Sequence, residues 1–381
     1  MPKIIHLICA ARPNFMKIAP LYHALAAQEW AKPVIIHTGQ HYDINMSDAF
    51  FQDLKLPSPH IHLEVGSGSH AELTAKVMVA YEKVVMETRP HMVVVVGDVN
   101  STIACTLAAV KIHYPENLPG YITNKPVIAH LEAGLRSRDR TMPEEINRLA
   151  TDVLADLLWT PSRDGDENLL NEGVAAEKIS FVGNIMIDSL EMMRPHIESI
   201  DEYTPLGLSK GQYAVVTLHR PANVDHEDSL KKLVTMLDHI SQKLPIVFPI
   251  HPRTRAQLDK HNLLETLDYN KNIRISEPLN YIRFMNLVFN SQMAITDSGG
   301  LQEETTVLGI PCLTMRPNTE RPVTISLGTN RLCTLDNVEE YVDLIVAGNF
   351  PKGKIPELWD GATAQRITSE INKLLCPENS D

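Results

Sequence analysis

The sequence predicts an α/β protein built from two doubly wound parallel sheets. Three features support this fold class: short apolar runs alternate with segments of helical spacing, many runs lack polar alternation, and one strand-free stretch divides the runs into two sets. The run Met-Val-Val-Val-Val-Gly at residues 92–97 is typical of a strand buried on both faces of a parallel sheet. Alternation of strand and helix then implies right-handed βαβ units.

Twelve apolar runs are predicted to be strands, six in each half of the chain. The first six are residues 3–10, 33–39, 92–98, 126–134, 157–162 and 179–184, and the second six are 212–219, 246–251, 273–278, 293–298, 312–315 and 331–335. Helical spacing is clear over residues 18–28, 71–88 and 228–243. The stretch 188–212 has breakers and charges but no strand pattern, so we expect a domain boundary near residue 187.

Composition and charge narrow the class of protein. The 381 residues are 44% hydrophobic and 22% charged, which excludes global disorder. The formal net charge of −12 argues against nonspecific binding to nucleic acid or to an anionic membrane, and no apolar stretch is long enough for a membrane span. The five cysteines are scattered without a Cys-x-x-Cys pair, which argues against a disulfide framework or a zinc site and for a cytoplasmic location.

Polar residues follow most of the predicted strands, at the ends where doubly wound sheets bind ligands. Ser298-Gly299-Gly300 is the best candidate anion site, because glycines allow close approach and the following helix offers free N–H groups. A helix start with a tight glycine turn fits this segment equally well. We also expect a branched side chain at Gly300 to strain the turn. The candidate cations for a bound anion are Arg12, Lys17 and Arg321.

Several carboxylates are candidates for chemistry. Asp98 and Glu132 end predicted strands, and Glu144 begins a helix after an arginine-rich loop. Carboxylates beside one site can hold different protonation states, which general acid–base chemistry needs. A strand-terminal Asp is also a common helix N-cap, and Glu144 fits equally well as a favourable first-turn charge. Glu303 and Glu304 lie just after the glycine turn, and a glutamate there suits hydrogen bonds from the ribose of a nucleotide diphosphate.

Other motifs are weaker. The chain has no Gly-x-x-x-x-Gly-Lys-Ser/Thr segment, which excludes a P-loop. Residues 66–71 formally match Gly-x-Gly-x-x-Ala but do not follow the first strand, so we interpret them as a polar loop before a helix. We expect His60 and His62 in a loop or a short edge strand rather than in a metal site.

Four segments occur in the order and spacing of one known family. They are His-Leu-Glu-Ala-Gly-Leu-Arg at 130–136, Pro-Glu-Glu-Ile-Asn-Arg at 143–148, Thr-Asp-Ser-Gly-Gly-Leu-Gln-Glu-Glu at 296–304 and Met-Arg-Pro-Asn-Thr-Glu-Arg-Pro at 315–322. In these segments the chain resembles the non-hydrolysing UDP-N-acetylglucosamine 2-epimerase family. The resemblance implies a GT-B fold, in which two Rossmann-like domains, 1–187 and a UDP-binding 188–363, face each other across a cleft. The final helix, within 364–381, would pack back on the first domain.

The resemblance also implies an activity. Members interconvert UDP-GlcNAc and UDP-ManNAc without a cofactor, by elimination of UDP to 2-acetamidoglucal and re-addition, and supply ManNAc-type sugars for surface polysaccharides. It further implies a homodimer and no metal. The alternatives are release of ManNAc and UDP by hydrolysis, a modified UDP-2-acetamido sugar as substrate, a GT-B glycosyltransferase, and a silent nucleotide-sugar-binding protein.

Matching positions assign roles by resemblance. Asp98, Glu132 and Glu144 become the acid–base candidates, and His219 lies beside the departing phosphate. Phe284 matches a position near uracil, although a core aromatic on a helix is equally plausible. Gln40 and His41 match part of an allosteric site of some members, but their downstream partners do not. The candidate UDP-binding residues are Arg12, Lys17, Arg148, His251, Phe284, Ser298, Gly299, Gly300, Glu304 and Arg321.

Overall fold

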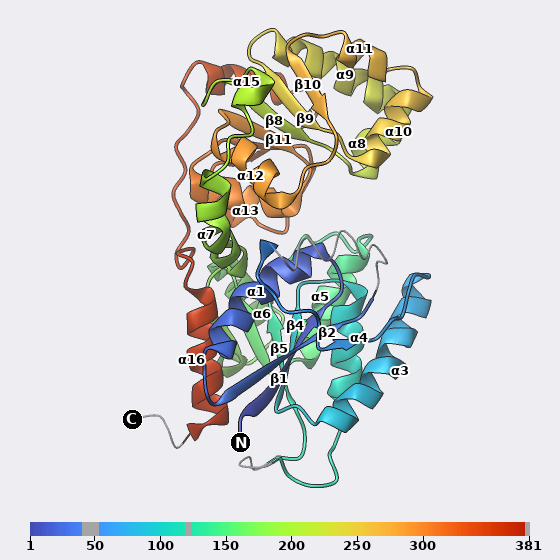
Figure 1. The fold of residues 1–381 in the computed structure, drawn as a ribbon, viewed down its shortest axis with the longest axis vertical. Helices are drawn as coiled ribbons and strands as arrows, with labels where there is room; N and C mark the ends of the chain where they lie inside the picture. The colour runs from blue at the N-terminus through green and yellow to red at the C-terminus, as the bar shows by residue number, and fades with distance from the viewer. Residues whose placement is uncertain (40–52, 119–122, 378–381) are drawn as a thin grey trace. The chain divides into compact units, whose positions relative to one another are not determined.

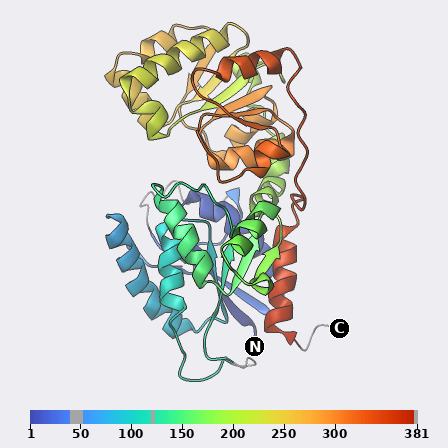
Figure 2. The same ribbon diagram turned by 180° about the vertical axis from the view of Figure 1, so that it is seen from behind.

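The computed structural model describes residues 1–39, 53–118 and 123–377 and divides into two compact units. Unit 1 comprises Met1–Met192 and Glu357–Asp381, and unit 2 comprises Met193–Pro356. Each unit is a parallel sheet flanked by helices (Figures 1 and 2). The first crossing from one unit to the other falls within α7 (Ile185–Glu198). Gln40 and His41 lie outside the described residues.

Unit 1 contains seven parallel strands in the order β3-β2-β1-β4-β5-β6-β7. The strands are β1 (Lys3–Cys9), β2 (Ala31–His37), β3 (Ile61–His62), β4 (Met92–Val96), β5 (Val127–Leu131), β6 (Leu157–Thr160) and β7 (Ile179–Phe181). The chain order reverses between β1 and β4, so the carboxyl ends of β1, β4 and β5 lie where a doubly wound sheet binds ligands.

The helices of unit 1 include the C-terminal helix of the chain. They are α1 (Arg12–Ala26), α3 (His70–Thr88), α4 (Asn100–Ala109), α5 (Pro143–Leu154), α6 (Arg163–Asn171), α7 and α16 (Thr363–Leu375). Helix α16 packs against α1 (Figure 1, red beside blue). The buried Asp188 of α7 accepts hydrogen bonds from the first amides of α16, at 3.1 Å from Thr363 and 2.7 Å from Ala364.

Unit 2 repeats this architecture with six parallel strands in the order β10-β9-β8-β11-β12-β13. The strands are β8 (Ala214–Thr217), β9 (Ile246–Pro249), β10 (Ile273–Ser276), β11 (Met293–Thr296), β12 (Cys312–Thr314) and β13 (Asn330–Leu332). The helices are α8 (Pro221–Val224), α9 (Glu227–Ser241), α10 (Pro252–Lys260), α11 (Leu264–Asp268), α12 (Tyr281–Phe289), α13 (Gly299–Leu308), α14 (Val323–Ser326) and α15 (Val338–Val346). The order reverses between β8 and β11.

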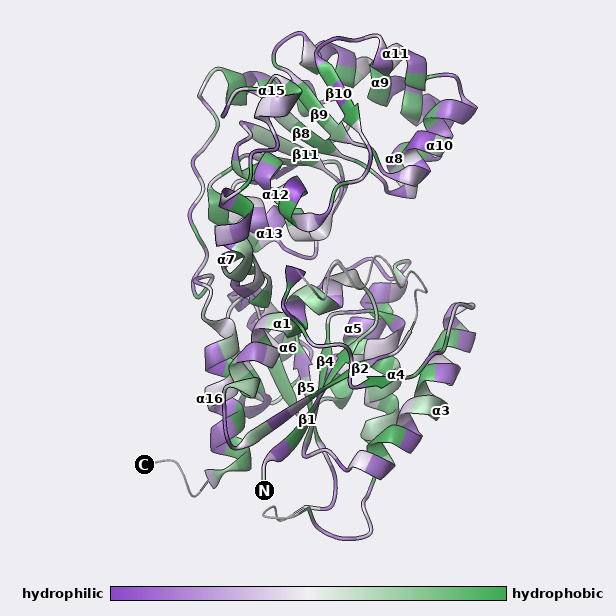
Figure 3. Ribbon diagram, viewed as in Figure 1, coloured by the Kyte–Doolittle hydropathy of each residue, from purple (hydrophilic) through white to green (hydrophobic). Residues whose placement is uncertain are grey.

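The predicted strands are confirmed, because each of the twelve runs overlaps one, although β2 and β13 begin before their runs. The strands are mostly apolar, and most helices carry one apolar and one polar face (Figure 3). His62 lies in the short edge strand β3, and Ser69 caps α3 after a polar loop, as expected. The stretch after residue 187 starts in α7, which continues through Pro195 because its apolar face buries Leu190, Met193 and Ile197.

Candidate active site

In unit 1, the ends of β4 and β5 bring Asp98 and Glu132 to one edge of the sheet. Lys17, on the first turns of α1, forms an ion pair with Glu132 Oε2, and both side chains are buried. Glu132 adopts a left-handed backbone conformation with φ 71°, which is uncommon outside glycine. Its other oxygen, Oε1, is buried without a hydrogen bond to any described residue. One oxygen of Glu132 is therefore held and the other is uncommitted.

Asp98 has the same asymmetry. Arg148 of α5 donates from Nε and Nη2 to a single oxygen, Asp98 Oδ2, at 3.0 and 2.8 Å. Within the described ranges, Oδ1 of Asp98 makes no hydrogen bond. Arg148 itself is only 3% exposed and pairs through Nη1 with Glu145. The sequence suggested a nucleotide contact for Arg148, whereas in the structure its guanidinium contacts these two carboxylates.

Glu144, the third predicted carboxylate, is half-buried in the first turn of α5. Its side chain has no hydrogen bond or ion pair with any residue that the structure describes. Arg12 begins α1, after the end of β1.

Sequence reasoning missed a buried network behind these residues. His130 of β5 contacts Asp152 through Nδ1 at 2.6 Å and the carbonyl oxygen of Gly97 through Nε2 at 2.8 Å. Asp152 also pairs with Arg136 at 2.7 Å and accepts from the Gly134 amide. Burial acts to raise the pKa of Asp152, but His130 and Arg136 hold it below its usual value. The signal was the His-Leu-Glu-Ala-Gly-Leu-Arg segment, which contains three partners of Asp152: His130, Gly134 and Arg136.

In unit 2, the organising residue is the fully buried Asp297 after β11. It accepts hydrogen bonds from the amides of His219 and Arg220 and from Asn223 Nδ2, the last two at 2.8 and 3.0 Å. The His219 ring lies 3.0 Å from Asp297. Burial raises the pKa of Asp297, but His219 and the donors outweigh it and hold the pKa below its usual value. Asp297 therefore fixes the loop that presents His219, whose side chain is 40% exposed.

His251 stacks near His219, with ring centroids 5.4 Å apart, and caps α10 by accepting from the Arg253 amide. Partial burial, together with His219 and Arg253, lowers its pKa. The two histidines thus lie side by side at the carboxyl ends of β8 and β9.

The glycine turn begins α13 after β11. Ser298 is the N-cap residue, but its side chain does not cap the helix, so the first-turn amides are left for another acceptor. Arg321 forms ion pairs with Glu303, at 3.0 Å, and with Glu320. A Cβ atom at Gly299 would lie 2.8 Å from Arg321 Nη1 and 3.0 Å from Glu320 Oε1, so any side chain there would displace the ends of these two side chains.

The expected strain at Gly300 is wrong. Its backbone is helical rather than left-handed, and a Cβ atom there would meet nothing within 4 Å. The space-limited glycine is Gly299, because Arg321 approaches it from a later part of the chain.

Glu304 of α13 is contacted by a residue of α12, the helix that also contains Phe284. Tyr281 of α12 donates to Glu304 Oε1 at 2.7 Å. Burial, with the nearby Glu303, raises the pKa of Glu304 to about 7, although the Tyr281 hydrogen bond acts to lower it. Phe284 is half-buried one turn along α12, so it is not a fully buried core aromatic.

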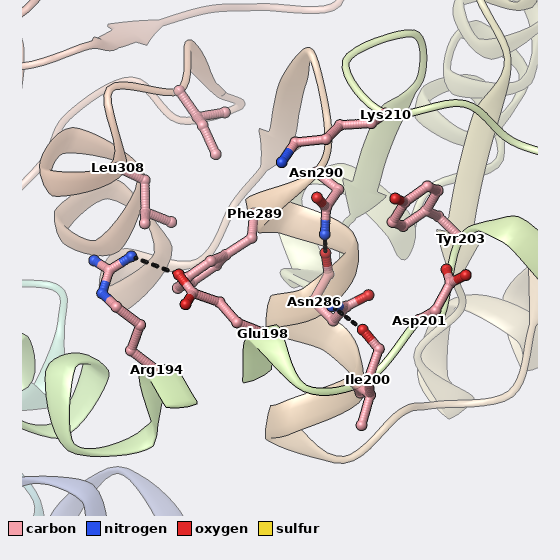
Figure 4. A pocket seen from close by; sticks show the side chains of 11 residues that line it. Arg194, Glu198, Ile200, Asp201, Tyr203, Lys210, Asn286, Phe289, Asn290 and Leu308 are labelled. Atoms are coloured by element: carbon pink, nitrogen blue, oxygen red, sulfur yellow. Dashed lines mark hydrogen bonds and ion pairs between the residues drawn. The ribbon is translucent and has the colours of Figure 1, made fainter. Parts of the chain in front are cut away.

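Outside these strand ends, a cavity of about 590 Å³ lies in unit 2 (Figure 4). Lys210 and Ile310, which line it, precede β8 and β12, so it is at the amino ends of the strands, away from the glycine turn. Arg194 and Glu198 form an ion pair at its wall, at 3.4 Å. None of the predicted site residues lines this cavity.

Other expectations can be compared with the described part of the chain. All five cysteines are free, and four of them are buried. Among residues 1–39, 53–118 and 123–377, no three His, Cys, Asp or Glu side chains gather as a metal site needs. No helix in those ranges combines the length and apolar composition required to cross a membrane. His60 accepts from the Ile35 amide, a structural contact beside β2.

Comparison with known proteins identifies similar sequences and folds. A family model described as UDP-N-acetylglucosamine 2-epimerase matches residues 23–372. The UDP-N-acetylglucosamine 2-epimerase of Methanocaldococcus jannaschii is 40% identical over 349 residues, 90% of this chain and 91% of that protein. The UDP-2,3-diacetamido-2,3-dideoxy-D-glucuronate 2-epimerase of Pseudomonas aeruginosa is 39% identical over 334 residues, 87% and 88% of the two chains.

A solved structure is similar over nearly the whole chain. The crystal structure of the Methanocaldococcus jannaschii UDP-GlcNAc 2-epimerase in complex with UDP-GlcNAc and UDP matches with a TM-score of 0.83 at 38% identity, covering 97% of this chain and 99% of that one. Together with the two parallel sheets, this likeness confirms the predicted GT-B-like fold class.

Proposed function

The chain belongs to the UDP-N-acetylglucosamine 2-epimerase family of isomerases, and we propose that it interconverts UDP-GlcNAc and UDP-ManNAc. The observation that carries the proposal is the pair of carboxylates at the ends of β4 and β5. Asp98 and Glu132 each have one oxygen paired with a cation and one oxygen free of hydrogen bonds to the described residues. Such a pair suits proton transfer on a sugar.

The proposed reaction is elimination followed by re-addition. A carboxylate removes the proton from C2, and the electrons of the C2–H bond form the C1–C2 double bond of 2-acetamidoglucal. The C1–O bond breaks, and its electrons leave with UDP. A second group returns a proton to the opposite face of C2, and UDP adds back to C1. Because the C2 proton is weakly acidic, its removal must be coupled to departure of a stabilised anion. Asp98, Glu132 and Glu144 are the proposed acid–base residues.

Unit 2 supplies groups suited to that anion. The first turn of α13, which lacks a side-chain cap, offers main-chain N–H donors and the positive end of a helix dipole. The partly exposed His219 is held by its contacts with Asp297, the residue that directly precedes Ser298. We propose that Ser298, Gly299 and Gly300 bind the diphosphate with His219, and that Glu304 accepts from the ribose. Further proposed contacts are Arg12 and Lys17 on phosphate oxygens, Arg321 and His251 nearby, and Phe284 on uracil.

Proton NMR of UDP-GlcNAc incubated with the protein in deuterated water tests the proposal. Epimerisation gives UDP-ManNAc with deuterium at C2. Free ManNAc and UDP would instead indicate the hydrolysing reaction. An unchanged substrate would contradict the epimerase and favour a glycosyltransferase lacking its acceptor or a silent binding protein.

A modified sugar is the second candidate substrate, because the Pseudomonas aeruginosa relative named for a diacetamido glucuronate is as similar as the UDP-GlcNAc enzymes. Running the same NMR experiment with UDP-2,3-diacetamido-2,3-dideoxy-glucuronate distinguishes the two. The substrate with the higher kcat/KM is the better assignment.

A further inference from the structure

We propose that Glu145 is a positioning residue for Asp98, acting through Arg148, and that Arg148 holds this carboxylate rather than a phosphate group. The inference rests on the proposed function, in which Asp98 transfers a proton. It concerns residues of α5, a helix of unit 1.

Arg148 holds Asp98 in a fixed orientation. Its Nε and Nη2 atoms both donate to Asp98 Oδ2, at 3.0 and 2.8 Å, and its Nη1 atom pairs with Glu145. All three guanidinium nitrogens therefore contact carboxylates, and the side chain is 3% exposed. Asp98 is 31% exposed, and its Oδ1 atom is left to reach a substrate. An arginine fork gives geometric control that a single contact does not.

The same helix also holds the main chain of Asp98. Asn147 donates from Nδ2 to the Asp98 carbonyl oxygen at 2.9 Å. On the opposite side, the preceding Gly97 lies beside Lys17 and Glu132, since a Cβ atom there would be 3.1 Å from Lys17 Nζ and 3.5 Å from Glu132 Oε2. Asp98 is thus positioned by α5 within reach of the second carboxylate.

Glu145 is the fixed point of this arrangement. It is 2% exposed and accepts from the Ser137 amide and hydroxyl, both at 3.0 Å, and from the Arg138 amide at 2.8 Å. Arg138 has φ 58°, so Glu145 also stabilises a left-handed turn outside glycine. Three loop donors hold the carboxylate, and Arg148 is its fourth partner. Loss of that charge would free Arg148 to reorient and Asp98 with it.

The neighbouring glutamate makes the contrast. Glu144 is half-buried and makes no hydrogen bond or ion pair with the described residues, whereas Glu145 is buried with four donors. These adjacent glutamates therefore have different proposed roles. Glu144 is available to a substrate, and Glu145 positions Asp98 through Arg148.

Glu145→Gln is the direct test, because it keeps the shape and removes the charge. Misplacing a reacting group by about 1 Å can cost about 100-fold in rate. We expect kcat for UDP-GlcNAc epimerisation to fall by about 10- to 100-fold, with KM and the calorimetric Kd for UDP close to those of the parent. Asp188→Asn is the matched control: Asp188 is an equally buried unit 1 carboxylate that accepts two amides at α16. It should retain the parent kcat despite a comparable loss of thermal stability.

Two further variants keep the test decisive if Glu145→Gln folds poorly. Ser137→Ala removes one donor to Glu145 and should lower kcat by about two- to fivefold. Arg148→Lys keeps the positive charge but loses the paired hydrogen bonds to Asp98. It should lower kcat without weakening the binding of UDP. Combined with Glu145→Gln, its effect should be less than additive, since both act on one contact.

Several results would overturn the proposal. Parent-like kcat in Glu145→Gln, or an equal loss of kcat in Asp188→Asn, would make Glu145 merely structural. A weaker UDP affinity with unchanged kcat in Arg148→Lys would make Arg148 a phosphate ligand. Failure of the proposed function is distinguishable, because the parent protein would then show no C2 deuterium exchange from UDP-GlcNAc.

Discussion

The two units present functional groups at equivalent strand ends, but they hold charge in different ways. In unit 1, carboxylates are paired with cations from helices, Glu132 with Lys17 and Asp98 with Arg148. In unit 2, the central carboxylate Asp297 is fully buried and accepts hydrogen bonds from main-chain amides, while Ser298 leaves the first amides of the following helix without a side-chain cap. Unit 1 therefore positions ionisable side chains, and unit 2 positions main-chain donors.

This difference has a practical consequence for mutagenesis. A site made of charged side chains is sensitive to the identity of a side chain, because a neutral isostere removes its proton-transfer chemistry. A site made of main-chain amides is sensitive to space, because any added atom blocks the approach of the ligand. The predictions below test the contrast, beginning with the largest effect.

Asp98→Asn should separate turnover from nucleotide binding. Loss of a proton-transfer group typically costs about 10²–10⁴-fold in rate, so kcat should fall within that range. UDP affinity, which we assign mainly to unit 2, should stay within about twofold of the parent by calorimetry. Near-normal turnover would remove Asp98 from the mechanism, and a large loss of UDP affinity would break the division between the units.

The two adjacent glycines test the space argument. Gly299→Ala should weaken the binding of UDP by about tenfold or more. Its Cβ atom would lie 2.8 Å from Arg321 and 3.0 Å from Glu320, so the ion pair between these residues beside the turn would have to shift. A Cβ atom at Gly300 has no protein atom within 4 Å, so we expect unit 2 of Gly300→Val to keep its stability in denaturant unfolding and to lose UDP affinity through contact with the diphosphate. Parent-like UDP binding by Gly300→Val would show that the diphosphate lies elsewhere.

These glycines also show the limit of reading the sequence. Strands could be predicted from local apolar runs, and strand ends gave the positions of Asp98 and Glu132. Which glycine is crowded depends on Arg321, more than twenty residues later, and no local pattern encodes that approach. The contrast between Glu144 and Glu145 likewise depends on how α5 faces the 137–138 loop. Long-range side-chain contacts, not secondary structure, were the missing information.

Asp297→Asn should mainly lower the free energy of unfolding rather than the catalytic rate. The buried carboxylate accepts several N–H donors, and leaving one without an acceptor costs about 1–3 kcal/mol. Because the folded pKa is below the ordinary 3.8, the stabilisation is present above that pH and is lost as pH falls through the folded value. Denaturant unfolding should therefore show a parent–variant difference at pH 7 that shrinks below about pH 4. A difference independent of pH would mean that the charge of Asp297 contributes nothing.

Titration of Glu304 should have the smallest and most specific of these effects. It should make the affinity of unit 2 for the nucleotide depend on pH. Its pKa of about 7 means that the carboxylate, the better acceptor for ribose hydroxyls, is lost as pH falls through neutrality. UDP binding should then weaken from pH 8 to pH 6 in the parent, and Glu304→Gln should flatten that slope. Stability moves the opposite way: a raised folded pKa means that its contribution is full below the ordinary 4.5 and is lost as pH rises through about 7.

Tyr281→Phe sharpens this last test without touching the carboxylate. The Tyr281 hydroxyl donates to Glu304 Oε1 at 2.7 Å and so lowers its pKa. Removing the hydroxyl should raise that pKa further and move the midpoint of the UDP-affinity profile upward, by about half a pH unit. At pH 7 the variant should bind UDP about two- to threefold more weakly and match the parent above pH 8.5. A uniform loss across the whole pH range would instead make Tyr281 a direct contact of the nucleotide, and the titrating group in unit 2 would have to be sought elsewhere.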